Sequence, residues 1–141
     1  MSTEASNKFK YSLAKGEVDF DTDTIKICLM ATAFSFDKDA HETWADVSAS
    51  ELAAGNGYTQ DTATLDNVSI TEDDVNDRCE VAWDDEVWTA AGGSIGPSPG
   101  AILYDDTHAS DIIIGYLDFT TERTALNGGT FTVSNIALRI S

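Results

Sequence analysis

A short glycine-rich string carries the clearest sequence signal for catalysis. Gly92-Gly93-Ser94-Ile95-Gly96 matches the G-x-S-x-G pattern, in which a serine nucleophile stands on a sharp turn between a strand and a helix. The next residues, Pro97-Ser98-Pro99-Gly100, cannot continue as that helix, because proline removes a helical hydrogen bond and clashes with the preceding turn. The string therefore predicts a loop, and we expect no enzymatic activity from Ser94.

Histidine is too rare in this chain to build a typical zinc site. The segment His41-Glu42-Thr43-Trp44-Ala45 begins like the zinc-binding H-E-x-x-H motif, but Ala45 stands where the second ligand is needed. His108 is the only other histidine. Because zinc sites use three or four ligands, we expect neither histidine to hold a metal.

Acidic residues could supply oxygen ligands for a hard cation. Asp19, Asp21 and Asp23 have the alternate spacing that opens a calcium-binding loop. The sixth position of that loop is Thr24 instead of glycine and the twelfth is Met30 instead of glutamate, so an EF-hand is excluded. We expect no cofactor, with one alternative left open: structural calcium held between subunits by the acidic runs Asp73-Asp74, Asp84-Asp85-Glu86 and Asp105-Asp106.

The charge of the chain limits its partners. Its 141 residues carry 25 acidic and 8 basic side chains, a formal net charge of −17 at pH 7. Nucleic acid phosphates and anionic membrane surfaces repel such a polyanion, so we expect no nucleic acid and no membrane among its partners. No apolar run is long enough to span a bilayer and the polar start lacks a secretory signal, which predicts synthesis in the cytosol with Cys28 and Cys79 reduced.

Short runs of alternating apolar residues dominate the rest of the chain. Residues 25–31 are apolar on both faces, as in an inner strand, and residues 112–119 alternate clearly. Asn127-Gly128 predicts a hairpin-type turn before the last strands. About eight short strands at regular spacing predict an all-β fold, a β-sandwich with the jelly roll as a variant. The other strand candidates are 63–65, 68–70, a pair at 79–83 and 87–89, then 101–104, 131–133 and 136–140.

Two segments depart from the strand pattern. Within residues 37–54, Ser48-Ala49-Ser50-Glu51 has the spacing of a capping box and predicts one or two short helical turns. Residues 92–100 contain two prolines and predict a loop or an irregular sheet edge, because proline cannot donate to a central ladder.

Residues 1–18 differ from the body in charge and are predicted to form an extended arm, leaving 19–141 as a single domain. Three lysines against Glu4 give the first fifteen residues a charge of +2, so the remainder carries −19. We expect the arm to contact a capsid protein or a neighbouring subunit by strand addition and charge pairing, so that its deletion leaves the domain folded. The expected contact residues are Lys8, Phe9, Lys10, Tyr11, Leu13 and Lys15.

Motifs spread along almost the whole chain form one pattern. They are Asn7-Lys8-Phe9-Lys10-Tyr11, Leu13-Ala14-Lys15-Gly16, residues 18–26, Trp44 with Val47-Ser48-Ala49, Gly57-Tyr58-Thr59, residues 114–119 and Asn127-Gly128. This pattern resembles a family of small virion proteins of tailed bacteriophages, the head decoration or cement type. The resemblance implies a β-sandwich subunit, often a homotrimer, that binds the major capsid protein on the outer capsid surface of the virion and stabilises the shell. It also implies assembly in the host cytoplasm.

Two other classes of function fit the same sequence. One is a different virion structural role, in the neck, the tail or a host contact. The other is a glycan-binding β-sandwich, in which Trp44, Tyr58 and the loop at residues 92–100 would form the binding surface.

Overall fold

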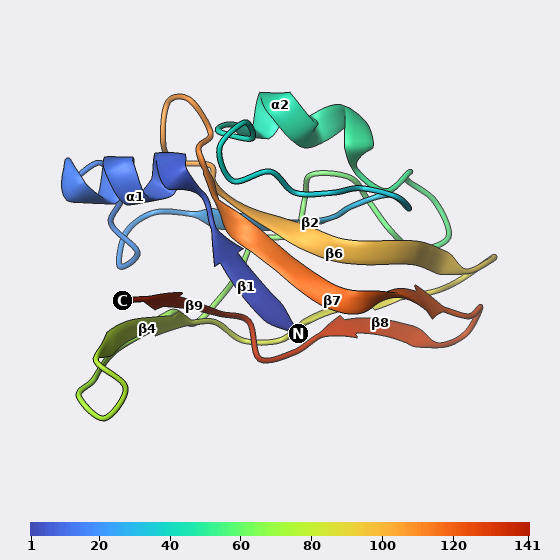
Figure 1. Cartoon of the computed structure of the whole chain (residues 1–141). Helices are drawn as coiled ribbons and strands as arrows, with labels where there is room; N and C mark the ends of the chain where they lie inside the picture. Colours follow the sequence, from blue (N-terminus) through green and yellow to red (C-terminus); the bar gives the residue numbers. More distant parts are fainter.

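The protein is all-β, with nine strands and two short helices in the computed structural model, which describes residues 1–141 (Figure 1). The helices are α1 (Asn7–Ala14) and α2 (Trp44–Val47), and a 3₁₀ turn (Ser48–Ser50) follows α2. No helix is both long and apolar enough to cross a membrane. The strands are β1 (Ser2–Ala5), β2 (Ile25–Leu29), β3 (Ser69–Asp73), β4 (Arg78–Ala82), β5 (Glu86–Thr89), β6 (Ile95–Asp105), β7 (Ile113–Ala125), β8 (Thr130–Val133) and β9 (Ala137–Ile140).

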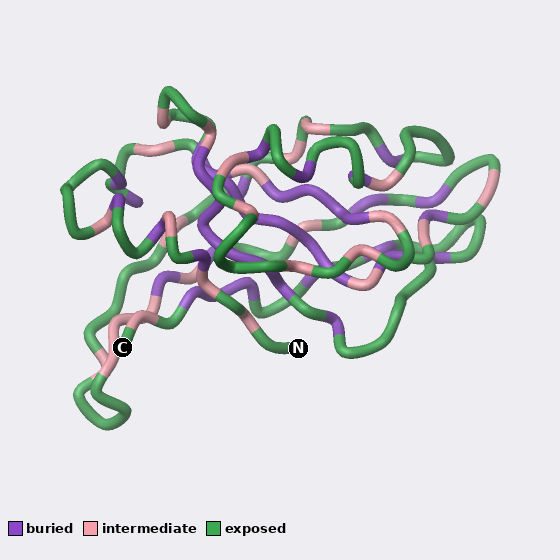
Figure 2. The backbone as a smooth tube through the Cα atoms, turned by 45° about the horizontal axis from the view of Figure 1, so that its top comes forward, coloured by how far each residue is buried: buried purple, intermediate pink, exposed green.

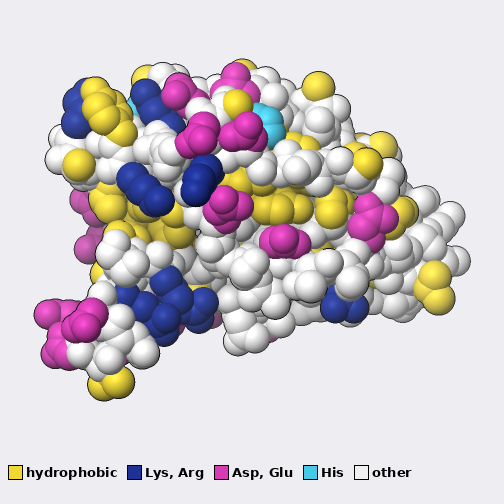
Figure 3. All heavy atoms as spheres, in the orientation of Figure 1, with side chains coloured by type: hydrophobic (Ala, Val, Ile, Leu, Met, Phe, Trp, Pro, Cys, Tyr) yellow, Lys and Arg dark blue, Asp and Glu magenta, His cyan; other side chains and the backbone are white.

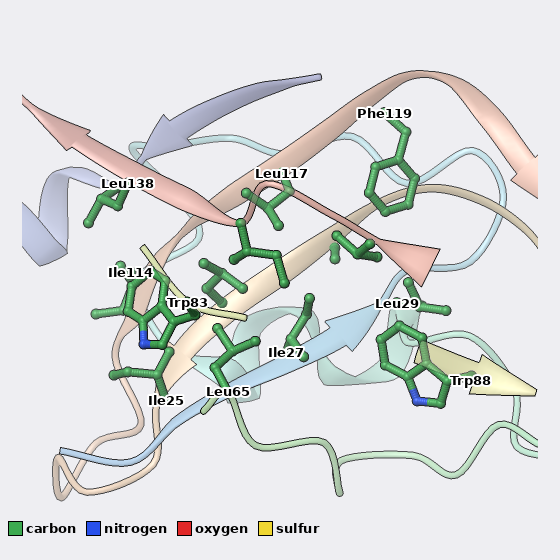
Figure 4. Packing of buried hydrophobic residues seen from close by; sticks show 14 of the residues in the cluster. Ile25, Ile27, Leu29, Leu65, Trp83, Trp88, Ile114, Leu117, Phe119 and Leu138 are labelled. Carbon is green, nitrogen blue, oxygen red and sulfur yellow. The ribbon is translucent and has the colours of Figure 1, made fainter. Parts of the chain in front are cut away.

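A four-stranded antiparallel sheet in the order β1-β7-β6-β2 forms one layer of a sandwich. The opposite layer consists of two smaller antiparallel sheets, β3-β4-β9 and β5-β8. The main core lies between these layers, where Ile25, Ile27 and Leu29 of β2 face Trp83 and Trp88 (Figure 4). The predicted all-β sandwich is confirmed, and both tryptophans are buried.

A second apolar cluster covers the other face of the four-stranded sheet. Cys28 and Met30 pack there with Ile102 and Ile113 beneath Trp44 of α2. The middle strands are therefore buried on both faces, as the purple central segments in Figure 2 show. This arrangement explains the apolar residues on both faces of the strand at 25–31, because each face contacts a different cluster.

The predicted extended arm at the chain start is wrong for residues 7–14, which form α1. Phe9 and Leu13 lie one helical turn apart, so the same residues that alternate along a strand also share one face of a helix. Phe9 is fully buried in the main core, and Leu13 packs against it. The segment is thus part of the folded body, and its deletion would open the core instead of releasing a free arm.

The strand expected for addition to another molecule is used within the chain. β1 pairs with β7, matching Ser2 to Asp118 and Ala5 to Gly115. The Thr3 hydroxyl also donates to the Ala137 carbonyl at 2.8 Å. β1 therefore joins the two layers along one side of the sandwich.

Two local predictions in the first half of the chain, the capping box at residues 48–51 and the strand at 63–65, are wrong. The capping box belongs to Thr43 and Asp46 at the start of α2, whereas Ser48–Ser50 is the 3₁₀ turn. Glu51 is no cap, because it is buried and forms an isolated bridge with Met30. Residues 63–65 form no strand of their own, although Thr64 bridges Lys26.

Three predictions in the second half concern how strands pair. The prolines at 97 and 99 lie in the first part of β6, which pairs only with β7 and in a shifting register, because β2 pairs with β6 from Ala101 onward. Of the two predicted alternatives, the irregular sheet edge is therefore found and the loop is not. β4 and β5 belong to different sheets and are not partners. Asn127 and Gly128 do form a turn, but it links β7 to β8, which pairs with β5 instead.

Candidate functional site

Helix α1 is fixed to the body by the residue that begins it. The Ser6 hydroxyl accepts a hydrogen bond from the Phe9 amide at 3.0 Å, which caps the helix, and donates to the Ile113 carbonyl at 2.5 Å. Phe9 then enters the core, with its ring centroid 5.7 Å from that of Phe20. The inward face of α1 is therefore held by a cap, a bond to β7 and an aromatic contact.

The outward face of α1 presents an aromatic ring between lysines. The Tyr11 side chain is 55% exposed. The Nζ atoms of Lys8 and Lys15 lie 5.2 and 5.1 Å from its ring centroid, within the range of cation–π attraction. Lys10 is also exposed, and Lys38 is joined to the helix start because its carbonyl accepts a hydrogen bond from the Asn7 amide. Basic side chains accordingly gather over α1, at the upper left of Figure 3.

The structure divides the six predicted contact residues into two groups. Lys8, Lys10, Tyr11 and Lys15 form an outward surface, which we call the lysine–tyrosine surface. We include exposed Lys38 in it, because the Lys38 backbone carbonyl is bonded to the start of the helix. The buried ring of Phe9 and the half-buried side chain of Leu13 support this surface from inside.

The lysine–tyrosine surface has fewer ion pairs than the basic residues elsewhere, among which only Arg123 has none. Elsewhere, Lys26 lies near Asp61 and Asp106, while Arg78 and Arg139 form ion pairs within the second layer. On the lysine–tyrosine surface only Lys15 has an ion pair, with Glu17 at 2.6 Å, and this contact raises the pKa of the Lys15 amine. Lys8, Lys10 and Lys38 have none, so their charges are available to a partner.

The serine string considered for catalysis lies in an unsuitable structural context. Ser94 directly precedes β6, whereas a nucleophile elbow leads from a strand into a helix. The backbone carbonyl of Ser94 accepts a bond from Asn56, 3.0 Å away. The two histidines have other contacts: His41 stacks near Phe34, and His108 lies 3.5 Å from Glu17.

The acidic loop at 19–23 uses its carboxylates to order itself. Asp19 accepts a bond from the Asp21 amide at 3.0 Å, and Asp23 accepts one from the Asp19 amide at 2.8 Å. Nowhere do three or more His, Cys, Asp or Glu side chains gather as a metal site. The acidic runs thus provide no ready-made cation site within one copy.

Asp105 is the most unusual carboxylate near that loop. It is fully buried at the end of β6, where its Oδ1 atom accepts bonds from the Thr107 and His108 amides at 2.9 and 3.2 Å. Its Oδ2 atom has no hydrogen-bond partner. Burial, together with the neighbouring Asp23 carboxylate, raises the pKa of Asp105 to about 6.

A buried polar network fastens residues 51–61 to the central sheet. The Glu51 Oε1 atom accepts bonds from the Tyr58 hydroxyl and from the Asp61 amide, both at 2.8 Å. The Tyr58 hydroxyl accepts a bond from the Leu29 amide at 2.9 Å, and the Tyr104 hydroxyl donates to the Asp61 carboxylate. Burial raises the pKa of Glu51. Every partner in this network belongs to the chain itself, so we assign it a structural role.

The two aromatic residues considered for glycan binding are not presented to solvent. Trp44 and Tyr58 are 8% and 3% exposed. Trp44 stacks on Tyr104 with ring centroids 5.0 Å apart, and residues 95–100 belong to β6. These aromatic side chains serve the core, so the lysine–tyrosine surface is the stronger candidate for a contact with another molecule.

The geometry defines the class of protein as a β-sandwich with an exposed, basic surface on its N-terminal helix. Comparison with protein-family models, with curated proteins and with solved structures finds no match.

Proposed function

We propose that the chain is a structural subunit of a tailed-bacteriophage virion, a head decoration protein that binds the outer surface of the major capsid protein shell and stabilises it. The resemblance of its motifs to that family suggests the particle. The lysine–tyrosine surface on α1 is the observation that carries the proposal, because it is an exposed aromatic residue ringed by cations on a strongly acidic body.

The chemistry of this surface favours an acidic protein partner. Tyrosine supplies contact area and a hydroxyl at low entropic cost, which makes it common at binding hot spots. The lysines that lack ion pairs can steer an acidic surface toward the ring, while the chain as a whole, with its net charge of −17, repels other copies that approach without orientation. The α1 helix is held rigidly against the body, so little conformational freedom would be lost on docking.

Point variants test the proposal better than deletion does, because α1 contributes Phe9 to the core. Lys10→Gln and Tyr11→Ala should weaken binding to purified capsid shells, measured by co-sedimentation, while leaving the far-UV circular dichroism spectrum unchanged. Each loss should be on the order of tenfold, as for a contact worth one to two kcal/mol.

Matched controls separate the surface from general effects of charge and apolarity. Thr59→Glu makes the same unit change in charge as Lys10→Gln on an exposed loop, and Val87→Ala removes a side chain that is 50% exposed, close to the 55% of Tyr11. Both controls should bind shells normally. If Lys10→Gln and Tyr11→Ala bind as tightly as the controls, α1 is not the docking surface. A different outcome would contradict the assignment to the head: neither the unmodified chain nor any variant binds shells, and electron microscopy shows the labelled chain on the necks or tails of particles.

A further inference from the structure

A groove runs between the two layers of the sandwich on the side where β1 ends. β1 covers only Gly115–Asp118 of β7 on this side, and the stretch Phe119–Ala125 has no strand beside it. β8 pairs with β5 along one edge, and no strand pairs with its other edge. The groove between these two free edges has a volume of about 450 Å³, and Met1 and Thr3 lie at its margin. A segment of another molecule could therefore place its side chains in the groove, beyond the end of β1.

The lining of the groove combines apolar, hydroxyl-bearing and basic side chains. Phe119 and Phe131 are among its apolar members, with ring centroids 5.9 Å apart. Arg123 and Arg139 also line it, although Arg139 is already bound to Glu80 at 2.9 Å. Arg123 has no ion pair. An occupant of matching chemistry would carry an apolar side chain next to a carboxylate.

The β3–β4 hairpin of the same chain has this chemistry. It projects from the body at the lower left of Figure 1, and Figure 3 shows acidic side chains gathered on it. Its tip carries Val75, which is 90% exposed, directly after Asp74. Asp73 is engaged by Arg78 at 3.0 Å, whereas Asp74 and Asp77 have no ion pair. An exposed valine with free carboxylates one residue before it and two residues after it is otherwise unexplained by the fold of one copy.

We propose that the β3–β4 hairpin of one copy inserts into the β7–β8 groove of a second copy. Val75 then contacts the lining residues Phe119 and Phe131, and Asp74 pairs with Arg123. Charge complementarity favours this occupant, because Arg123 is a cation without an ion pair and the hairpin tip carries carboxylates without ion pairs. The lysine–tyrosine surface is the other place with unpaired cations, and the Lys10→Glu control below separates the two.

This contact is heterologous, since each copy offers one hairpin and accepts another at a different place. Such contacts produce a closed ring when the rotation between copies closes, and an open filament when it does not. The inference goes beyond docking on a shell by α1, because it concerns contact between copies and uses a different surface.

Charge reversal and its rescue test the inference in the isolated chain. Sedimentation velocity over a concentration series should show self-association of the unmodified chain. Arg123→Glu and Asp74→Lys should each weaken that association about a hundredfold, because each places like charges together. Val75→Ala should weaken it on the order of tenfold. The double variant R123E/D74K should regain the association, since the pair is restored with its signs exchanged.

Lys10→Glu is the control for charge reversal outside the groove, and it should leave self-association unchanged. A chain that stays monomeric at every concentration overturns the inference. So does an Arg123→Glu variant that associates normally, or a double variant that fails to recover. These measurements contain no capsid shell. They can therefore contradict the contact between copies without contradicting docking by α1, and shell-binding measurements can contradict docking by α1 without affecting the contact between copies.

Discussion

Replacing Asp105 with asparagine should stabilise the protein at neutral pH, which is unusual for a fully buried residue. The pKa of this carboxyl rises from 3.8 to about 6 on folding, so the folded state binds its proton more tightly than the unfolded state does. The stability that this proton gives is complete below the unfolded pKa and is lost as the pH rises through about 6. Above that pH, a charged, buried carboxylate faces Asp23.

The size of the effect follows from the shift. A difference of about 2 pKa units, at about 1.4 kcal/mol per unit, corresponds to about 3 kcal/mol of lost stability above the folded pKa. Asparagine keeps the shape and the acceptor oxygen for the Thr107 and His108 amides, and its amide group can donate to Asp23. Asp105→Asn should therefore gain about 2 to 3 kcal/mol at neutral pH and almost nothing near the unfolded pKa.

Urea unfolding between about pH 4 and pH 8 measures this difference. The gap in unfolding free energy between Asp105→Asn and the unmodified chain should widen as the pH rises and level off above the folded pKa. Asp21→Asn, the same chemical change on an exposed residue of the adjoining loop, should show no such widening. A gap that stays constant with pH, or that shrinks as the pH rises, would refute the assignment of a raised pKa to Asp105.

Three further outcomes are expected. Phe9→Ala should lower the unfolding free energy by about 3 to 5 kcal/mol in urea titrations, because the ring is fully buried, and a loss below about 1 kcal/mol would show that α1 is dispensable. Tyr58→Phe should cost about 1 to 3 kcal/mol in the same titrations, because it leaves the Leu29 amide without a partner and removes one of the two hydrogen bonds to Glu51, and an unchanged midpoint would contradict the network. Added sodium chloride should raise the melting temperature in calorimetry, because it screens repulsion within a chain of charge −17, and a flat or falling melting temperature would show that repulsion costs little.

The sequence predicted the β architecture well where apolar patterns were long. Residues 25–29 and 113–119 are strands because both of their faces meet apolar clusters, and that pattern is visible in the residues themselves. Helix α1 was missed because Phe9, Tyr11 and Leu13 fit a strand period while Phe9 and Leu13 fit a helical one. Ser6, a favoured N-cap residue directly before that segment, was the signal that could have decided for the helix.

The candidate surfaces were only partly accessible to sequence reasoning. The excess of lysines near the chain start located the lysine–tyrosine surface, but which side chains point outward depended on the helix. The buried network of Glu51, Tyr58 and Asp61 has no local pattern, since its groups meet only after residues 51–61 fold against the central sheet. The β7–β8 groove depends on where β1 stops along β7, which is a property of pairing and not of composition.

The pairing of β1 with β7 also has a consequence for how the chain reaches its native state. Ser2 lies opposite Asp118, so this side of the main sheet joins two segments that are far apart in the sequence. During translation β1 has no partner until the ribosome has delivered β7, and α1 cannot place Phe9 before then. Contacts between such distant segments slow folding, because a long loop must close before they form. We infer that the lysine–tyrosine surface matures late, after most of the sandwich has been synthesised, so incomplete chains would not present it to an assembly partner.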